Sequence, residues 1–195
     1  MHPPKRLVKA VVLDWGGTVL DYGNALASQS LAAAFRAKGL TVSPEEIRRF
    51  AGHDKRDLIR ELLRVDAVHQ QFVRAHGENP SERDVAELHR LFEPALTELL
   101  AARCELIPGV REAVERLRIM GVKVGSSTGY SKAVMAALQP LAEQQGFVPD
   151  SLVTAVEVNR GQPFPWMIFR NAENLGVYPL SALVKVGDTL QDVAA

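Results

Sequence analysis

Short strand-like runs, separated by amphipathic stretches of helical length, make up the second half of this chain. The runs at residues 122–126, 151–153 and 183–186 have the length of buried strands, and helical patterns separate them. A similar apolar run occupies residues 11–13. Strands that alternate with helices form parallel sheets, because each crossover returns the chain to the same end of the sheet. The pattern therefore predicts a parallel α/β sheet.

Only helical signals occur between the first run and the second. Gly39 is expected to end one helix, and a capping box at Ser43 begins the next. A further helix is expected from Ser81 to about Ala101, with a kink or a second boundary at Pro94.

These signals predict a helical insertion at about residues 24–104, between the first strand and the rest of the sheet. Its hinges are expected near residues 22–23 and 106–108. An insertion at this point would lie over the end of the first strand, where it can close on a substrate and exclude water.

Composition excludes several classes of function. The chain has 195 residues, and its 23 lysines and arginines balance 23 aspartates and glutamates, so no global charge attracts nucleic acid. No apolar stretch approaches the roughly 20 residues that cross a bilayer, so no membrane partner is expected. Because Cys104 is alone and the amino terminus lacks the apolar run of a signal peptide, we expect a reduced, cytoplasmic protein.

Asp14 is the candidate nucleophile. It directly follows the run at residues 11–13, which places it at the carboxyl end of a buried strand, where open α/β sheets bind ligands. Gly16 and Gly17 come next and let backbone amides approach an anion closely, which suits phosphoryl chemistry. The alternative is that Asp14 only caps a turn after a core strand.

Two further polar clusters follow predicted strands. Thr128 and Gly129 precede a helix amino terminus and form a candidate phosphate cradle, although such residues also serve as simple caps. Asp188 and Asp192 follow the last strand. Asp188 together with Asp14 would suit Mg²⁺, which binds one or two carboxylates plus phosphate oxygens. The alternative is an N-cap with a solvated partner.

Together the three clusters resemble the motifs of the haloacid dehalogenase superfamily, whose members have an aspartate nucleophile and a helical cap. Four longer runs are similar to its phosphonatase branch, the phosphonoacetaldehyde hydrolases. The motifs are Asp14-x-x-x-Thr18, Ser127-Thr128-Gly129 and Gly187-Asp188-Thr189-x-x-Asp192, and the runs are residues 14–23, 125–130, 163–167 and 185–189.

The resemblance implies a Rossmann-like parallel α/β core with an inserted helical cap. The core would comprise residues 1–23 and 105–195, with its C-terminal part missing, and the cap residues 24–104. The superfamily continues through another strand and helix, so a truncated chain is expected.

Family members pair through their caps, which makes a homodimer possible here. Leu58, Leu62 and Leu63 would either line that surface or form the interior of the cap.

The resemblance also implies a mechanism. Lys55 matches the family's cap lysine, which condenses with the aldehyde of a small phosphonate substrate to form an imine while Asp14 attacks phosphorus. Water would then hydrolyse the aspartyl phosphate, giving acetaldehyde and phosphate. Gly16 stands where phosphatases of the superfamily carry an aspartate that protonates a leaving ester oxygen, and a phosphonate has no such oxygen.

The remaining site residues are carried over in the same way. The phosphoryl group would be bound by Thr128, Gly129, Arg160 and Gln162. Mg²⁺ would be held by Asp14, Asp188 and the carbonyl of Gly16, with Asp192 orienting the metal site.

Two departures from the family keep other functions open. Gln162 stands where the family has an arginine, and Leu58 stands where it has a histidine near the imine lysine. One alternative keeps the Asp14 chemistry on a phosphate monoester or another phosphonate, with Lys55 contributing only charge. Lys55 could also be a solvated helix lysine paired with Asp54 or Asp57. A third alternative is a catalytically silent, truncated homologue that binds phosphate compounds or a partner protein.

Overall fold

The computed structural model describes residues 8–21, 23–50 and 53–195, and in that part of the chain four strands form one sheet in the order β3-β2-β1-β4. All neighbouring strands are parallel, which confirms the predicted α/β class. The strands are β1 (Ala10–Leu13), β2 (Lys123–Thr128), β3 (Ser151–Thr154) and β4 (Leu183–Val186).

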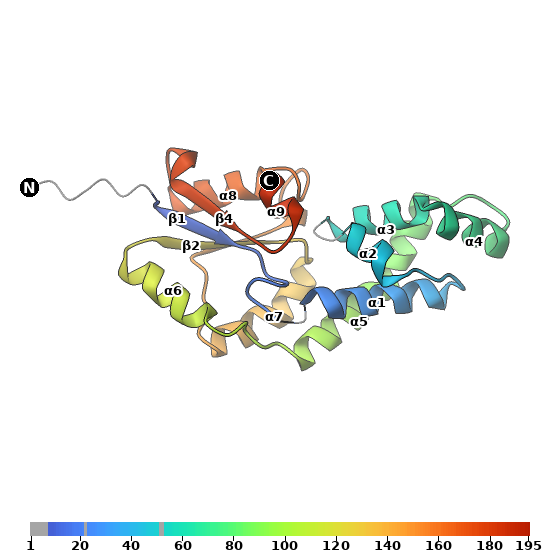
Figure 1. Ribbon diagram of the computed structural model, residues 1–195, viewed down its shortest axis with the longest axis horizontal. Helices are drawn as coiled ribbons and strands as arrows, with labels where there is room; N and C mark the ends of the chain where they lie inside the picture. The colour runs from blue at the N-terminus through green and yellow to red at the C-terminus, as the bar shows by residue number, and fades with distance from the viewer. Residues whose placement is uncertain (1–7, 22, 51–52) are drawn as a thin grey trace, which may run out of the picture.

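The helices of the described chain divide into two groups (Figure 1). The first group follows β1 without an intervening strand and comprises α1 (Gly23–Ala37), α2 (Pro44–Arg49), α3 (Lys55–Arg64), α4 (Asp66–His76) and α5 (Glu82–Ala102). The second alternates with the later strands and comprises α6 (Val110–Ile119), α7 (Lys132–Gln144), α8 (Trp166–Leu175) and α9 (Leu190–Ala194). Two short 3-10 turns are η1 (Ala155–Glu157) and η2 (Leu180–Ala182). None of the described helices has both the length and the apolar character that a membrane crossing requires.

β1 is a central strand that aligns its two neighbours. Its residues 10–12 are almost fully buried, as expected for a parallel strand covered on both faces. Leu13 pairs with Ser126 of β2 and with Val186 of β4. The carboxyl ends of these strands therefore lie at one edge of the sheet, and this edge collects the polar residues that follow them.

The chain leaves the sheet and returns to it through two adjacent segments. Leu20 and Leu106 form an antiparallel bridge. The predicted hinge at residues 106–108 therefore lies beside the segment that leads out of the sheet. Tyr22, part of the other predicted hinge, lies outside the described residues.

Helices α1 to α5 pack on one another through buried apolar side chains, and Figure 1 shows α2 to α4 standing apart from the sheet. α5 also contacts α7, which joins this helical block to the sheet. Leu58, Leu62 and Leu63 are buried inside the block, so they form its interior and are not an exposed pairing surface. The division into two domains and a homodimer stay predictions.

The helix boundaries in the block agree with the sequence pattern except at one proline. Ser43 Oγ accepts a hydrogen bond of 3.1 Å from the Glu46 amide, and Gly39 has a φ of 72° just after α1, as predicted. A second boundary at Pro94 is wrong, because α5 runs through it. Buried Phe92 and Leu96 pack on either side of Pro94 and offset the hydrogen bond that proline removes.

Gly125 lets α8 approach β2 closely, which predicts a stability change. A Cβ added at Gly125 would lie 2.6 Å from Asn171 Oδ1, and the Asn171 amide donates to the Ser126 carbonyl at 3.0 Å. Gly125→Ala is expected to lower the free energy of unfolding by about 1–3 kcal/mol, measured by urea denaturation. The control is Gly129→Ala, whose Cβ would contact the His53 carbonyl at 3.4 Å, because both changes restrict the unfolded chain equally. Equal losses in the two variants would contradict the packing argument.

Candidate functional site

The residues that follow β1, β2 and β4 line one small pocket, of about 20 Å³, at the carboxyl edge of the sheet. Lys55 from the helical block and Gln162 from the loop before α8 reach the same pocket. The described residues that line it are Asp14, Gly16, Lys55, Thr128, Gly129, Tyr130, Gln162 and Thr189. The structure thus brings together most of the residues that the sequence predicts for the site.

Asp14 is strongly perturbed by its surroundings. Burial raises the pKa of its carboxyl to about 7. The Asp192 carboxylate acts in the same direction, and the Lys185 ammonium opposes it. A carboxyl with such a shift inside a pocket is typical of a functional group.

Three carboxylates converge beside the pocket. One oxygen from each of Asp14, Asp188 and Asp192 lies within 4.8 Å of the other two. Mg²⁺ takes oxygen ligands and commonly uses one or two carboxylates while it keeps several waters. Asp14 and Asp188 fit that donor set, and Gly16 lines the adjoining pocket. The cluster is therefore a candidate Mg²⁺ site.

The Asp192 carboxylate is engaged by protein donors. Thr189 Oγ1 donates to it at 2.6 Å, and Lys185 Nζ pairs with it at 2.9 Å. Gln162 Nε2 also donates to it, at 2.5 Å. Burial acts to raise the pKa of Asp192, but the Thr189 hydrogen bond and the Lys185 charge outweigh burial and hold the pKa below its usual value. A Cβ at Gly187 would overlap this carboxylate, so the glycine permits the approach. These contacts suit the predicted orienting role.

Lys185 is a site residue that the sequence motifs did not single out. Its side chain is 10% exposed and pairs with Asp192. The signal that could have identified it is a lysine within the otherwise apolar run of β4, because a charge in such a strand needs a partner. Its ammonium partly balances the acidic cluster.

Lys55 reaches the pocket from the start of α3. Burial lowers the pKa of its ammonium, against the charges of Asp14 and other nearby carboxylates. Its Nζ lies 5.5 Å from the centre of the Tyr130 ring. The position of Lys55 in the pocket, with burial as the largest influence on its pKa, does not favour the alternative of a solvated helix lysine. Asp54 caps α3, and Asp57 pairs with Arg60 of the same helix.

The segment that leads into α3 lies directly on the loops of the sheet edge. A Cβ added at Gly129 would lie 3.4 Å from the His53 carbonyl, and one added at Gly161 would lie 3.6 Å from Asp54 Cβ. These are ordinary contact distances, so the segment before α3 packs against both loops. The close packing holds Lys55 over the pocket.

Thr128 and Gly129 are not explained as caps of the helix that follows. Ser131 is the N-cap of α7, and its Oγ accepts a hydrogen bond of 3.3 Å from the Val134 amide. Thr128 Oγ1 accepts a hydrogen bond of 3.1 Å from the Tyr130 amide, which fixes the turn that lines the pocket.

Of the two predicted binding residues in the loop before α8, Gln162 lies in the small pocket and Arg160 lies outside it. Gln162 is buried and lines the small pocket. Arg160 is exposed and lines a neighbouring hollow, with its guanidinium carbon 4.0 Å from the centre of the Phe164 ring. Stacking on an aromatic face suits this cation, so the loop keeps Arg160 away from the small pocket.

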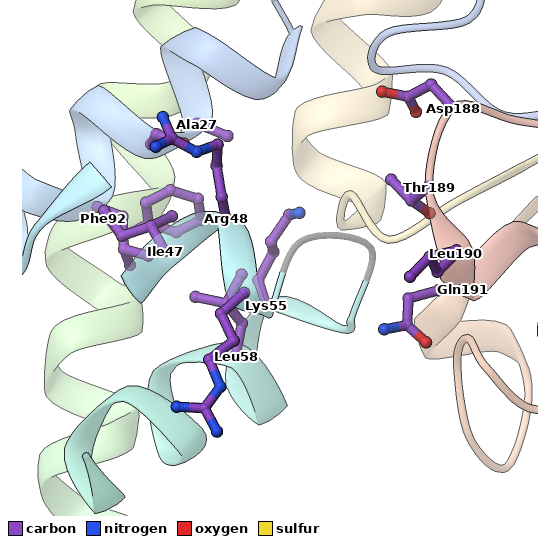
Figure 2. Close-up of a pocket in the computed structure, with 13 residues that line it drawn as sticks. Ala27, Ile47, Arg48, Lys55, Leu58, Phe92, Asp188, Thr189, Leu190 and Gln191 are labelled. Atoms are coloured by element: carbon purple, nitrogen blue, oxygen red, sulfur yellow. The ribbon is translucent and has the colours of Figure 1, made fainter. Parts of the chain in front are cut away.

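A larger pocket of about 340 Å³ adjoins the small one, and Lys55 and Thr189 line both. Figure 2 shows the Lys55 amine directed from the helical block toward the loop that carries Asp188 and Thr189. The other lining residues on the side of the helical block are Ala27, Ser28, Leu31, Ile47, Arg48, Arg49, Leu58 and Phe92. Those on the other side are Asp188, Leu190 and Gln191.

Comparison with known proteins agrees with this geometry. A family model of haloacid dehalogenase-like hydrolases matches residues 8–195. A phosphonoacetaldehyde hydrolase-like protein from Syntrophobacter fumaroxidans is 43% identical over 192 residues, which cover 98% of this chain and 69% of that protein. A phosphonoacetaldehyde hydrolase from Bacillus cereus is 39% identical over 186 residues, which cover 95% of this chain and 70% of that protein.

A solved structure shows the same relationship. The crystal structure of a phosphonoacetaldehyde hydrolase-like protein from Oleispira antarctica has a TM-score of 0.92 and 35% identity, and the match covers 96% of this chain and 68% of that one. The chain therefore spans roughly two thirds of the length of these relatives. Similarity along nearly all of its length shows that it belongs to the haloacid dehalogenase-like hydrolases and, within them, to the phosphonoacetaldehyde hydrolase family.

Proposed function

We propose that this protein hydrolyses the carbon–phosphorus bond of phosphonoacetaldehyde, a small phosphonate, with Mg²⁺ as cofactor. The observation that carries the proposal is that Asp14 and Lys55 line one small pocket and that burial favours the unprotonated amine of Lys55. The Asp14 carboxylate, in its ionised form, is an acceptor for phosphorus, and the unprotonated Lys55 amine can form an imine. The activity named for the relatives supports the same substrate.

Lys55 acts as the electron sink in this proposal. Its unprotonated amine condenses with the aldehyde and releases water, and the protonated imine then draws electrons from the neighbouring carbon–phosphorus bond. A lowered pKa keeps more of the amine unprotonated near pH 7. Burial of Lys55 therefore favours the first step.

Asp14 attacks phosphorus in the second step. The carbon–phosphorus bond breaks, its electrons pass into an enamine on Lys55, and the phosphoryl group is carried by Asp14. Protonation and hydrolysis of the enamine release acetaldehyde, and water hydrolyses the aspartyl phosphate to phosphate. Gly16 offers no acid at this point, and none is needed because no ester oxygen leaves.

The other residues bind and orient. The proposed Mg²⁺ ligands are Asp14, Asp188 and the carbonyl of Gly16, where the bound ion would neutralise phosphoryl charge. Thr128 and Gly129 would hold phosphoryl oxygens, and Gln162 would donate one hydrogen bond. Asp192, held by Thr189 and Lys185, would orient the metal site.

Gln162 favours a second candidate function. A neutral amide does not reproduce the charged, bidentate contact of an arginine, and Leu58 adds no acid or base beside Lys55. In this second function Asp14 acts on a phosphate ester or another phosphonate, and Lys55 contributes only charge. The lowered pKa of Lys55 supports the first candidate, because a lysine that acts only through its charge gains nothing from it.

Borohydride trapping tests the Lys55 step. With phosphonoacetaldehyde and Mg²⁺, reduction is expected to fix an adduct on the Lys55 peptide, located by mass spectrometry. Lys55→Arg is expected to lose the adduct and to lower kcat by about 10³-fold or more, because a guanidinium cannot form the imine.

Lys38→Arg is the matched control, because Lys38 lies in the same helical block and pairs with Glu87 at 2.8 Å. This variant should keep both the adduct and the turnover. Phosphate release from phosphonoacetaldehyde without an adduct on Lys55 would contradict the imine step and favour the second candidate.

Asp14→Asn tests the buried carboxyl through stability. The pKa of Asp14 is about 7 in the folded protein against an ordinary value of 3.8, so between these values the folded state keeps a proton that the unfolded state has lost. The stability contributed is full below about pH 4 and is lost as the pH rises through 7, by up to about 4 kcal/mol. With a chelator present, Asp14→Asn is therefore expected to melt higher than wild type at pH 8, and the difference should shrink at pH 5.

Added Mg²⁺ should raise the melting temperature of wild type more than that of Asp14→Asn, because the variant lacks one proposed ligand. Asp66→Asn replaces an exposed carboxylate at the start of α4 and serves as the control. If the melting temperatures of Asp14→Asn and Asp66→Asn change with pH in the same way, the raised pKa of Asp14 is contradicted. If Mg²⁺ does not raise the melting temperature of wild type, the proposed metal site is contradicted.

A further inference from the structure

Two pockets of very different size meet at Lys55. The small pocket of about 20 Å³ is lined by Asp14 and the polar residues of the sheet edge. The larger pocket of about 340 Å³ begins at Lys55 and Thr189, which line both. A molecule whose phosphoryl group fills the small pocket therefore has the larger one beside its carbonyl carbon, where the Lys55 nitrogen would bond.

The wall of the larger pocket on the side of the helical block has an apolar part, to which α1, α2, α3 and α5 contribute Ala27, Leu31, Ile47, Leu58 and Phe92. Ser28, Arg48, Arg49 and Lys55 line the same side, and Figure 2 shows Ala27, Ile47, Leu58 and Phe92 on it. A volume of this size with an apolar wall and a few polar groups is typical of a site that encloses an organic group of several carbons. In phosphonoacetaldehyde the carbonyl carbon carries the phosphonomethyl group and a hydrogen atom. No part of that molecule would extend into this space.

We propose that the larger pocket binds the alkyl chain of 2-oxoalkylphosphonates, ketones that carry this chain on the carbonyl carbon. The proposal rests on the proposed function, since it uses the same Lys55 imine and the same attack by Asp14. It adds a substrate class, which the apolar walls beside Lys55 select.

The chemistry balances in the same way as for the aldehyde. Lys55 and the ketone lose one water to form the imine, and attack by Asp14 on phosphorus breaks the carbon–phosphorus bond with its electrons passing into the enamine. One proton and one water return the methyl ketone and the free amine, and a second water releases phosphate from Asp14. The net reaction consumes one water and gives a methyl ketone and phosphate.

The neighbouring hollow that Arg160 lines suits an alkyl chain less well. Its walls include the charged side chains of Asp54, Arg56, Asp57 and Arg60, and Lys55 does not line it. An alkyl chain there would displace water from charged groups without replacing their hydrogen bonds. The apolar pocket is therefore the favoured place for the chain.

A series of ketones with methyl, ethyl, propyl and butyl groups on the carbonyl carbon tests the proposal through phosphate release. Within this series kcat/KM is expected to rise about fourfold for each added methylene until the pocket is filled. The comparison stays among ketones because an aldehyde is intrinsically more reactive. A flat or falling kcat/KM from methyl to propyl would overturn the proposal.

Ala27→Leu fills part of the larger pocket from α1 and should lower kcat/KM for the propyl ketone at least tenfold more than for the methyl ketone. Ala25→Leu is the matched control on the same helix, because Ala25 is exposed and lies outside this pocket. Gln191→Phe narrows the pocket from the other side and gives the same test if Ala27→Leu does not fold. Equal effects of the pocket and control variants on both ketones would overturn the proposal.

Phosphonoacetaldehyde, assayed in parallel, distinguishes the two possible failures. If it is hydrolysed and trapped on Lys55 while no ketone releases phosphate, the further inference is wrong and the proposed function stands. If neither the aldehyde nor any ketone is hydrolysed by the folded wild-type protein with Mg²⁺, both are wrong.

Discussion

The register of β1 against β2 and β4 is the constraint on which the site depends. Leu13 is paired with Ser126 on one side and Val186 on the other, and the Asp14 amide donates to the Val186 carbonyl at 2.9 Å. A shift of one residue would turn every side chain of the strand to the opposite face. The buried residues at 10–12 oppose that shift, because it would disrupt apolar packing on both faces. Core packing thus places Asp14 beside the carboxylates that follow β4.

The same packing removes Asp14 and Lys55 from water, so each of them is harder to keep charged in the folded protein. Burial raises the pKa of Asp14 and lowers that of Lys55, so the folded protein holds two groups away from their ordinary charge states. Asp192 is also buried, but the Thr189 hydrogen bond and the Lys185 charge hold its pKa below the usual value. In the proposed chemistry a metal ion, a phosphoryl group and an imine would replace the missing solvation of Asp14 and Lys55. The unfavourable desolvation of both groups would then be compensated during the reaction.

Much of the sheet edge was predictable, because its signals are local. A strand that ends at an aspartate and a glycine pair places Asp14, and a strand followed by Thr128 and Gly129 places the candidate phosphate cradle. The parallel sheet, the helical insertion and the capping box at Ser43 follow from periodicity and caps in the same way. The family motifs supplied Lys55, because its local sequence alone favours a solvated residue on a helix.

Other features depend on contacts between distant segments and were not visible in the pattern. Lys185 lies in the site because Asp192 folds back onto β4, and Arg160 lies outside it because it stacks on Phe164. Pro94 fails to end α5 because buried side chains on both sides of it hold the helix. The larger pocket arises only when the helical block and the loop after β4 come together, so no single motif encodes it.

The central claim is that Lys55 and Asp14 act on one substrate in sequence, so that phosphoryl transfer to Asp14 depends on Lys55. The most direct test is rapid-quench mass spectrometry of the Asp14 peptide during a single turnover of phosphonoacetaldehyde with Mg²⁺. We expect a transient phosphate on Asp14 in wild type and none in Lys55→Arg on the same time scale. Equally fast phosphorylation of Asp14 in Lys55→Arg would contradict the claim.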